Sequence, residues 1–162
     1  MQDVAFFTEE LEAKRIRFFN KILVKEKIIP DKETALLLGL EKDQEVNYIE
    51  RLRLVMNQPL YFTIIHIPDK ICSGFIENDL INNSTTSLIE GKYGIHISGI
   101  KRYLNPVNRS AFPKAAEVLN IEKNTCFFYM RSILFDKEEK PIGFYEDFFS
   151  NEKSEFTFYT KR

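Results

Sequence analysis

The sequence predicts one α+β domain built on an antiparallel sheet, and two observations support this class. Strand-like runs follow one another through short turns, whereas a parallel α/β fold would alternate strands strictly with helices. A helix–strand–hairpin unit also occurs twice along the chain, and two such units bury their apolar faces most simply by joining into one sheet. The 162 residues, 44% of them hydrophobic, are enough for a single domain with a substantial core.

In the first half of the chain, capping residues and alternating apolar side chains indicate the elements. Thr8, followed by two acidic residues, is a typical N-cap and predicts a short helix start. Pro30 and Asp31 separate a strand from the helix that follows it. The expected elements are a strand at 18–27, a helix at 32–38, and strands at 46–55 and 60–67 that form a hairpin through the turn at 56–59.

The second half is expected to begin with helical turns and to end with a second hairpin. Pro68 ends the first hairpin, because proline has no N–H to donate to a sheet. The expected elements are helical turns at 75–80 and 87–92, a strand at 95–104, a helix at 113–119, and a hairpin formed by residues 127–136 and the segment after Pro141.

The internal repeat is visible at three places in the sequence. The pentapeptide LGLEK at 38–42 returns as LNIEK at 119–123, and the strand VNYIERLRLV returns as FFYMRSILFD. With one added turn residue, Pro59 at the start of the second hairpin strand corresponds to Pro141. The two copies therefore predict two equivalent hairpins in one sheet.

Arg51 and Arg53 lie two residues apart in an otherwise apolar strand, so period-two alternation places both on one face of the sheet. Burying two like charges without partners is unfavourable. They either pair with acidic residues on a solvated face, or form a fork for a phosphate or carboxylate. The second copy has Ser132 and Leu134 at these positions, so the arginines are not a general requirement of the unit.

A second candidate for anion binding is Ser87. With Glu90 three residues later it matches a capping box, which predicts that Ser87 opens a helix. Free N–H groups at helix starts bind anions, although an ordinary cap is the commoner role of such a motif. Thr8, at the other expected helix start, is a similar case.

Composition and motifs exclude several classes of function. Lys plus Arg number 23 against 24 for Asp plus Glu, which argues against binding of a nucleic-acid backbone by this chain itself. There is no signal-peptide pattern and no apolar run of transmembrane length. The nucleotide-binding, α/β-hydrolase and zincin motifs are absent from the sequence.

The reactive side chains suggest neither a metal site nor a catalytic one. His66 and His96 lack metal-ligand spacing, and Cys72 and Cys126 have no nearby partner, so both cysteines are expected as reduced thiols. No nucleophile and base stand out as a pair. We therefore expect no enzyme activity and no cofactor or metal.

Several short motifs follow one another from residue 7 to residue 149, within a resemblance that extends to about residue 158. They are Phe7-Thr8-Glu9-Glu10, Leu36 to Val46 followed by Ile49-Glu50-Arg51-Leu52-Arg53, Gln58-Pro59-Leu60, Ile67-Pro68, Asp79-Leu80, Ser87-Leu88, Tyr93-Gly94-Ile95, and Pro141-Ile142 ahead of Phe148-Phe149. No single one is specific, but their order and spacing resemble the UTRA domain, the effector-binding half of HutC-type GntR transcription regulators.

This resemblance implies a chorismate-lyase-like fold, in which helices flank an antiparallel sheet, and a cytoplasmic homodimer. In the family, the domain binds a small metabolite and signals to an N-terminal winged-helix domain that contacts operator DNA. In members that sense sugar phosphates, two arginines, a serine and a threonine hold the phosphate. These residues correspond to Arg51, Arg53, Ser87 and Thr8.

The rest of the effector pocket is expected to differ from that of the relatives. By the resemblance, Thr63, His66, Tyr145 and Phe149 would face the effector, and a glutamate of the family is replaced by Gly143. The anion-binding end is kept while the other end is less polar. The resemblance therefore implies an anionic effector such as an organic acid, or a sugar phosphate other than an amino-sugar phosphate.

Three hypotheses for function follow. The first is an effector-sensing and dimerisation domain of a transcription repressor that spans residues 1–162, either a fragment without its winged helix or a free-standing sensor. The second is an enzyme of the same fold that acts on a small carboxylated substrate such as chorismate. The third is a protein-interaction module whose arginines are surface charges.

Overall fold

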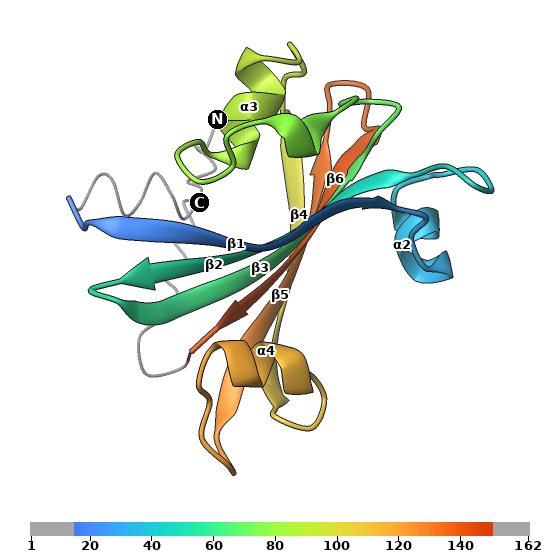
Figure 1. Ribbon diagram of the computed structural model, residues 1–162. Coiled ribbons are helices and arrows are strands. Elements are labelled where there is room, and N and C mark those ends of the chain that lie inside the picture. Colours follow the sequence, from blue (N-terminus) through green and yellow to red (C-terminus); the bar gives the residue numbers. More distant parts are fainter. Residues whose placement is uncertain (1–14, 151–162) are drawn as a thin grey trace, which may run out of the picture.

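Six antiparallel strands form one sheet in the computed structural model, which describes residues 15–150 (Figure 1). The helix start expected at Thr8 lies outside the described residues. The strands are β1 (Phe18–Ile28), β2 (Val46–Val55), β3 (Gln58–Pro68), β4 (Gly99–Asn108), β5 (Cys126–Phe135) and β6 (Pro141–Phe149). The helices are α2 (Lys32–Leu37), the 3-10 turn η1 (Phe75–Glu77), α3 (Thr85–Gly91) and α4 (Pro113–Val118).

The order of the strands is β1-β2-β3-β6-β5-β4, so the two repeated hairpins meet in the middle of the sheet. Ile64 of β3 pairs with Glu146 of β6. Because Pro59 corresponds to Pro141 in the repeat, Ile64 and Glu146 occupy the same position in their two units. The units are thus related by an approximate two-fold axis through this pair, and the predicted α+β class with a duplicated hairpin is confirmed.

Local sequence explains the ends of several elements. Asp31 caps α2, since its Oδ1 accepts a hydrogen bond from the backbone N of Thr34 at 2.8 Å. The β2–β3 hairpin closes through Met56 and Asn57, which both have positive φ (50° and 60°), as in a type I′ turn. The turn is therefore tighter than the predicted loop at 56–59.

Three expected elements have different bounds in the structure. The strand predicted at 95–104 begins only at Gly99 and continues to Asn108, and the helical turns predicted at 75–80 shorten to η1. β4 is an edge strand, which allows it to contain Pro106. The helix predicted to open at Ser87 begins two residues earlier, at Thr85.

The two faces of the sheet are covered by different helices. On the face that contains Arg51 and Thr63, called here the arginine face, Ile49 and Ile65 pack with Phe75 and other side chains from η1 and α3. In Figure 1, α3 lies above the strands and α4 below them.

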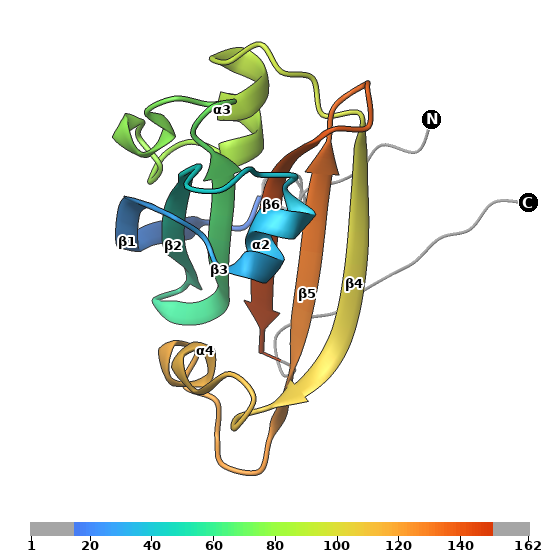
Figure 2. The same ribbon diagram turned by 90° about the vertical axis from the view of Figure 1, so that its right-hand side faces the viewer.

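The opposite face, called here the α4 face, is covered by α4 and by the α2 region (Figure 2). Phe62 and Phe148 of the central strands pack there against Ala116 of α4. Leu38, just after α2, packs against Phe144. Polar pockets remain between these apolar clusters on both faces.

Within residues 15–150, no helix has the length and apolar character needed to cross a membrane. Cys72 is buried and Cys126 is exposed, and both are free thiols.

Candidate functional site

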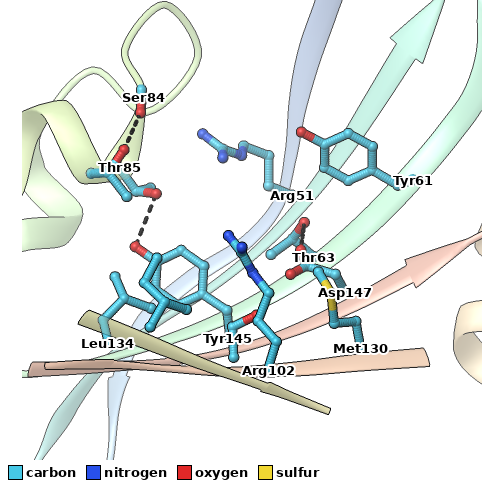
Figure 3. A pocket seen from close by; sticks show the side chains of 13 residues that line it. Arg51, Tyr61, Thr63, Ser84, Thr85, Arg102, Met130, Leu134, Tyr145 and Asp147 are labelled. Atoms are coloured by element: carbon cyan, nitrogen blue, oxygen red, sulfur yellow. Dashed lines mark hydrogen bonds between the residues drawn. The ribbon is translucent and has the colours of Figure 1, made fainter. Parts of the chain in front are cut away.

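A small cavity opens on the arginine face, beneath the start of α3 (Figure 3). Its volume of about 50 Å³ is several times the roughly 10–15 Å³ that one water molecule needs. Strand side chains form its floor, and Ser84, Thr85 and Thr86 form its upper wall. The cavity therefore has the size of a small polar group such as a phosphate or a carboxylate.

Arg51 projects from the middle of β2 into this cavity and is only 5% exposed. Its guanidinium group points toward the segment that contains Ser84 and Thr85 (Figure 3). One guanidinium nitrogen, Nη1, donates a long hydrogen bond of 3.4 Å to the backbone oxygen of Asn83. Arg51 is thus held near the start of α3 by a weak contact that a stronger acceptor could replace.

Arg53 lies on the same face, as alternation predicts, but its surroundings differ. It is 1% exposed, and its Nε donates to Oδ1 of Asn20 at 2.9 Å. Its guanidinium carbon lies 4.2 Å from the centre of the Phe18 ring and 5.1 Å from that of Tyr61. Arg53 does not line the cavity but packs between aromatic rings beside it, where cation–π contacts stabilise it.

A second arginine does line the cavity, namely Arg102 of the edge strand β4. Its side chain points into the same space as that of Arg51 from the other end of the sheet (Figure 3). Arg102 pairs across strands with Ser132, which is the counterpart of Arg51 in the repeat. The sequence alone did not reveal this residue, because its position depends on the register between β4 and β5.

Asp147 on β6 is a buried carboxylate beside these arginines, and it too was missed from the sequence. Its Oδ1 accepts a hydrogen bond of 2.7 Å from Oγ1 of Thr63 on the neighbouring strand. Burial raises the pKa of Asp147 to about 6, although the hydrogen bond from Thr63 and the charges of Arg102, Arg51 and Arg53 oppose this shift. The carboxylate is therefore mostly ionised at neutral pH and takes up a proton in mild acid.

Tyr145 connects the floor of the cavity to α3. Its hydroxyl donates to Oγ1 of Thr85 at 3.0 Å, and burial raises the pKa of Tyr145, so the phenol stays protonated. Ser84 is the N-cap of α3, and its Oγ lies 2.7 Å from Oγ1 of Thr86. The hydroxyl groups around the cavity are thus organised by the sheet on one side and by α3 on the other.

Ser87 is not the cap of this helix, which corrects the capping box predicted from the sequence. The backbone N of Ser87 is the donor, and Oγ of Ser84 accepts its hydrogen bond at 3.4 Å. Glu90 accepts instead from the backbone N of Ile97. Ser87 is exposed and does not line the cavity, whereas Ser84, Thr85 and Thr86 do.

The other predicted ligand-binding residues fall in different places. Thr63 and Tyr145 line the cavity. His66 is on the α4 face, where its ring stacks 5.6 Å from that of Phe144. Phe149 is on the arginine face but buried in an apolar cluster with Tyr61. Thr8 lies outside the described residues.

The cavity has a net positive charge from its lining residues. The guanidinium groups of Arg51 and Arg102 outweigh the single carboxylate of Asp147. Hydroxyl groups from Thr63 and Thr85 can donate or accept hydrogen bonds. Such an arrangement can bind an anionic group through charge-assisted hydrogen bonds, while Asp147 can accept a hydrogen bond from a neighbouring hydroxyl of the same ligand.

Residues 15–155 match the UTRA domain. The chain belongs to the UTRA family. It is a UTRA domain of the kind found in GntR-family transcription regulators, and it has their chorismate-lyase-like fold. No curated protein is significantly similar to the chain in sequence.

Similar solved structures agree with this assignment. The effector domain of PhnF from Mycobacterium smegmatis has a TM-score of 0.89 at 16% identity, over 99% of this chain and 98% of that one. A GntR-family transcriptional regulator from Enterococcus faecalis has a TM-score of 0.77 at 19% identity, over 87% and 99%.

YydK from Bacillus subtilis has a TM-score of 0.79 at 20% identity over 90% of this chain, but the UTRA chain spans only 63% of YydK. At these identities the likenesses show the fold.

Proposed function

We propose that this UTRA domain senses a small anionic metabolite in the cavity on the arginine face and thereby regulates a bacterial transcription repressor. The single observation that supports the proposal most is the convergence of Arg51 and Arg102 from distant strands on one cavity. Two guanidinium groups around a space of this size suit a phosphate or a carboxylate. A sugar phosphate or an organic acid is the proposed class of effector.

The cavity accommodates the charged group of such an effector, and the rest of the molecule extends outward from it. The carboxylate of Asp147 repels a second negative charge of the effector near Thr63. It can, however, accept a hydrogen bond from a hydroxyl group of the effector. This environment favours a ligand with one anionic group next to a hydroxyl. Phosphorylated sugars and hydroxy acids both have that character.

Signalling would begin at the contact between Arg51 and the backbone oxygen of Asn83. An anion bound to Arg51 replaces this 3.4 Å hydrogen bond with a shorter, charge-assisted one. The segment before α3 is then released, or held by the ligand itself. The domain then has two states that differ in the position of α3. The effector shifts the population toward the state for which it has the higher affinity, and an effector with equal affinity for both states shifts nothing.

The complete regulator would act as a cytoplasmic homodimer whose winged-helix domains contact operator DNA. A change in α3 would alter the geometry between the two protomers, so that the DNA-binding domains no longer match the spacing of their half-sites. The winged-helix domain would belong to the full regulator, as the greater length of YydK suggests.

A thermal-shift screen of phosphorylated sugars, hydroxy acids and chorismate tests the proposal. We expect at least one phosphorylated sugar or hydroxy acid to raise the melting temperature, and Arg51→Ala to remove this effect. No stabilisation by any member would contradict an anion sensor. Release of pyruvate from chorismate would instead favour the enzyme hypothesis.

A further inference from the structure

A second and larger cavity lies on the α4 face, between α2 and α4 (Figure 2 shows both helices on this side). Its volume is about 440 Å³, within the roughly 300–1,000 Å³ typical of small-molecule pockets. The whole thickness of the sheet separates it from Arg51. The anion site therefore does not explain its polar lining.

The deepest charged residue of this cavity is Glu50, which is 2% exposed. Its Oε1 accepts hydrogen bonds from the hydroxyl of Tyr48 at 2.6 Å and from Nζ of Lys114 at 2.5 Å. Its other oxygen, Oε2, is buried and has no hydrogen-bond partner. A buried carboxylate oxygen without a donor is unfavourable, and such groups call for an explanation.

A second buried acceptor lies nearby, on the neighbouring strand. His66 is 5% exposed, and burial lowers the pKa of its imidazole to about 4, so the ring is neutral at physiological pH. Its Nδ1 is buried and has no hydrogen-bond partner, and it can accept a hydrogen bond when the proton of the neutral ring is on Nε2. A neutral imidazole with its proton on Nε2 leaves Nδ1 as a lone-pair acceptor.

The charged residues that line this cavity give it a net negative charge. Four of its lining residues have carboxylate groups, and one, Lys114, has an ammonium group. The side chain of Lys114 is 62% exposed and reaches Glu50 from solvent. Burial and the charges of Asp31 and Glu33 raise the pKa of Glu146, as expected in a negative environment.

We propose that this cavity is a second ligand site, which binds a small organic cation with an ammonium or guanidinium group. The cation displaces the ammonium group of Lys114 from Glu50 and takes over its role as counter-ion. The buried Oε2 of Glu50 and Nδ1 of His66, which this displacement uncovers, then accept hydrogen bonds from the cation. A guanidinium group supplies several donors from one plane, which suits two acceptors on adjacent strands. Within residues 15–150, no His, Cys, Asp and Glu side chains cluster as a metal site would need, so an organic cation fits better than a metal ion.

Butylguanidinium is the probe, and the neutral butylurea, which has nearly the same shape, is its matched control. Calorimetric titration of the chain is expected to show binding of the cation and none of the urea. Glu50→Gln keeps the shape of the side chain but removes its charge, and we expect it to weaken binding by about tenfold or more. Glu138→Gln makes the same change on an exposed turn and should have no effect.

Lys114→Met provides the sharper test, because the ammonium group of Lys114 forms an ion pair with the carboxylate of Glu50 when no ligand is bound. Removing this competing cation should tighten the binding of butylguanidinium by several-fold, whereas a purely structural role of Lys114 would weaken it. Equal binding by Glu50→Gln, equal binding of butylurea, or weaker binding by Lys114→Met would each overturn the proposal. A parallel titration with inorganic phosphate reports on the anion cavity independently.

Discussion

Thr63 and Asp147 face each other on the paired central strands β3 and β6, and the threonine hydroxyl donates to the buried carboxylate at 2.7 Å. This pair lies at the floor of the cavity that Arg51 and Arg102 line. The site thus contains a carboxylate whose charge opposes the anion that the arginines attract. The protonation of Asp147 is therefore expected to set the affinity for anions.

The first prediction concerns pH. Burial raises the pKa of Asp147 from 3.8 to about 6, so the carboxylate becomes neutral as the pH falls through 6. The site then loses a negative charge while its arginines stay charged. Sulfate, whose own charge is constant over this range, should bind more tightly below pH 6 than at neutral pH, as measured by calorimetry.

Asp147→Asn serves as the reference for this effect. We expect the variant to bind sulfate at neutral pH as tightly as the original chain does in mild acid, with a flat pH profile. If the sulfate affinity of Asp147→Asn still rose steeply as the pH fell, a group other than Asp147 would be responsible for the pH dependence.

The raised pKa of Asp147 should also make the stability of the fold depend on pH. Between about pH 4 and 6 the folded chain binds more protons at Asp147 than the unfolded chain, so the free energy of unfolding decreases as the pH rises through this window. At neutral pH, Asp147→Asn removes the burial of a charge and should stabilise the fold by on the order of 1 kcal/mol. Urea unfolding of both chains at neutral pH measures the difference, and a loss of stability would show that the ionised form is favoured in the fold.

Strand alternation was enough to predict that Arg51 and Arg53 share a face, because this property depends only on local geometry. Alternation also separates Thr63 from His66, since three residues along a strand reverse the face. The resemblance had grouped these two residues at one site, and the local pattern already argued against it.

Other features of the site depend on contacts between distant segments. Arg102 reaches the cavity only through the register of β4 with β5, and Asp147 meets Thr63 only because the two hairpins join. Ser84 and Ser87 are both residues that can cap a helix, and the local sequence pattern favoured Ser87, whereas α3 is capped by Ser84.

A further prediction separates the two arginines of β2. Arg51→Ala should weaken sulfate binding by about tenfold or more and leave stability nearly unchanged, because its contact with the backbone of Asn83 is long. Arg53→Ala should instead destabilise the fold by on the order of 2 kcal/mol, because Arg53 packs between Phe18 and Tyr61 and donates to Asn20. Calorimetry and urea unfolding of both variants measure the two effects.

Lys25→Ala is the charge-matched control for both arginine variants, since Lys25 is exposed on β1 away from the cavity. The same loss of affinity in Lys25→Ala would indicate a general electrostatic effect. If Arg53→Ala weakened sulfate binding without loss of stability, both arginines would contact the anion directly.

The β2–β3 turn offers a test of the fold alone. Met56 is 87% exposed and has a φ of 50°, a left-handed conformation that is unfavourable for its side chain. Asparagine is preferred at the first central position of a type I′ turn, so Met56→Asn should stabilise the domain by about 0.5–1 kcal/mol. Thermal unfolding measures the gain, and Leu36→Asn, at an exposed helix position, is the control that should not stabilise.

The last prediction concerns the connection between the sheet and α3. Tyr145→Phe removes the hydroxyl that donates to Thr85, and Thr85→Val removes its acceptor while keeping the shape of the side chain. Each change should cost about 1 kcal/mol, and the double variant should cost clearly less than the sum, because the second change has no hydrogen bond left to remove. Urea unfolding of the four chains in this cycle gives the coupling energy.

If α3 transmits the presence of an anion, the coupling energy between Tyr145 and Thr85 should differ with and without the ligand. Sulfate at saturation is expected to alter the coupling between Tyr145 and Thr85, because the anion contacts Arg51 beside the same segment. A coupling energy that is identical with and without sulfate would mean that the hydrogen bond only holds the fold together, and that the signal leaves the cavity by another path.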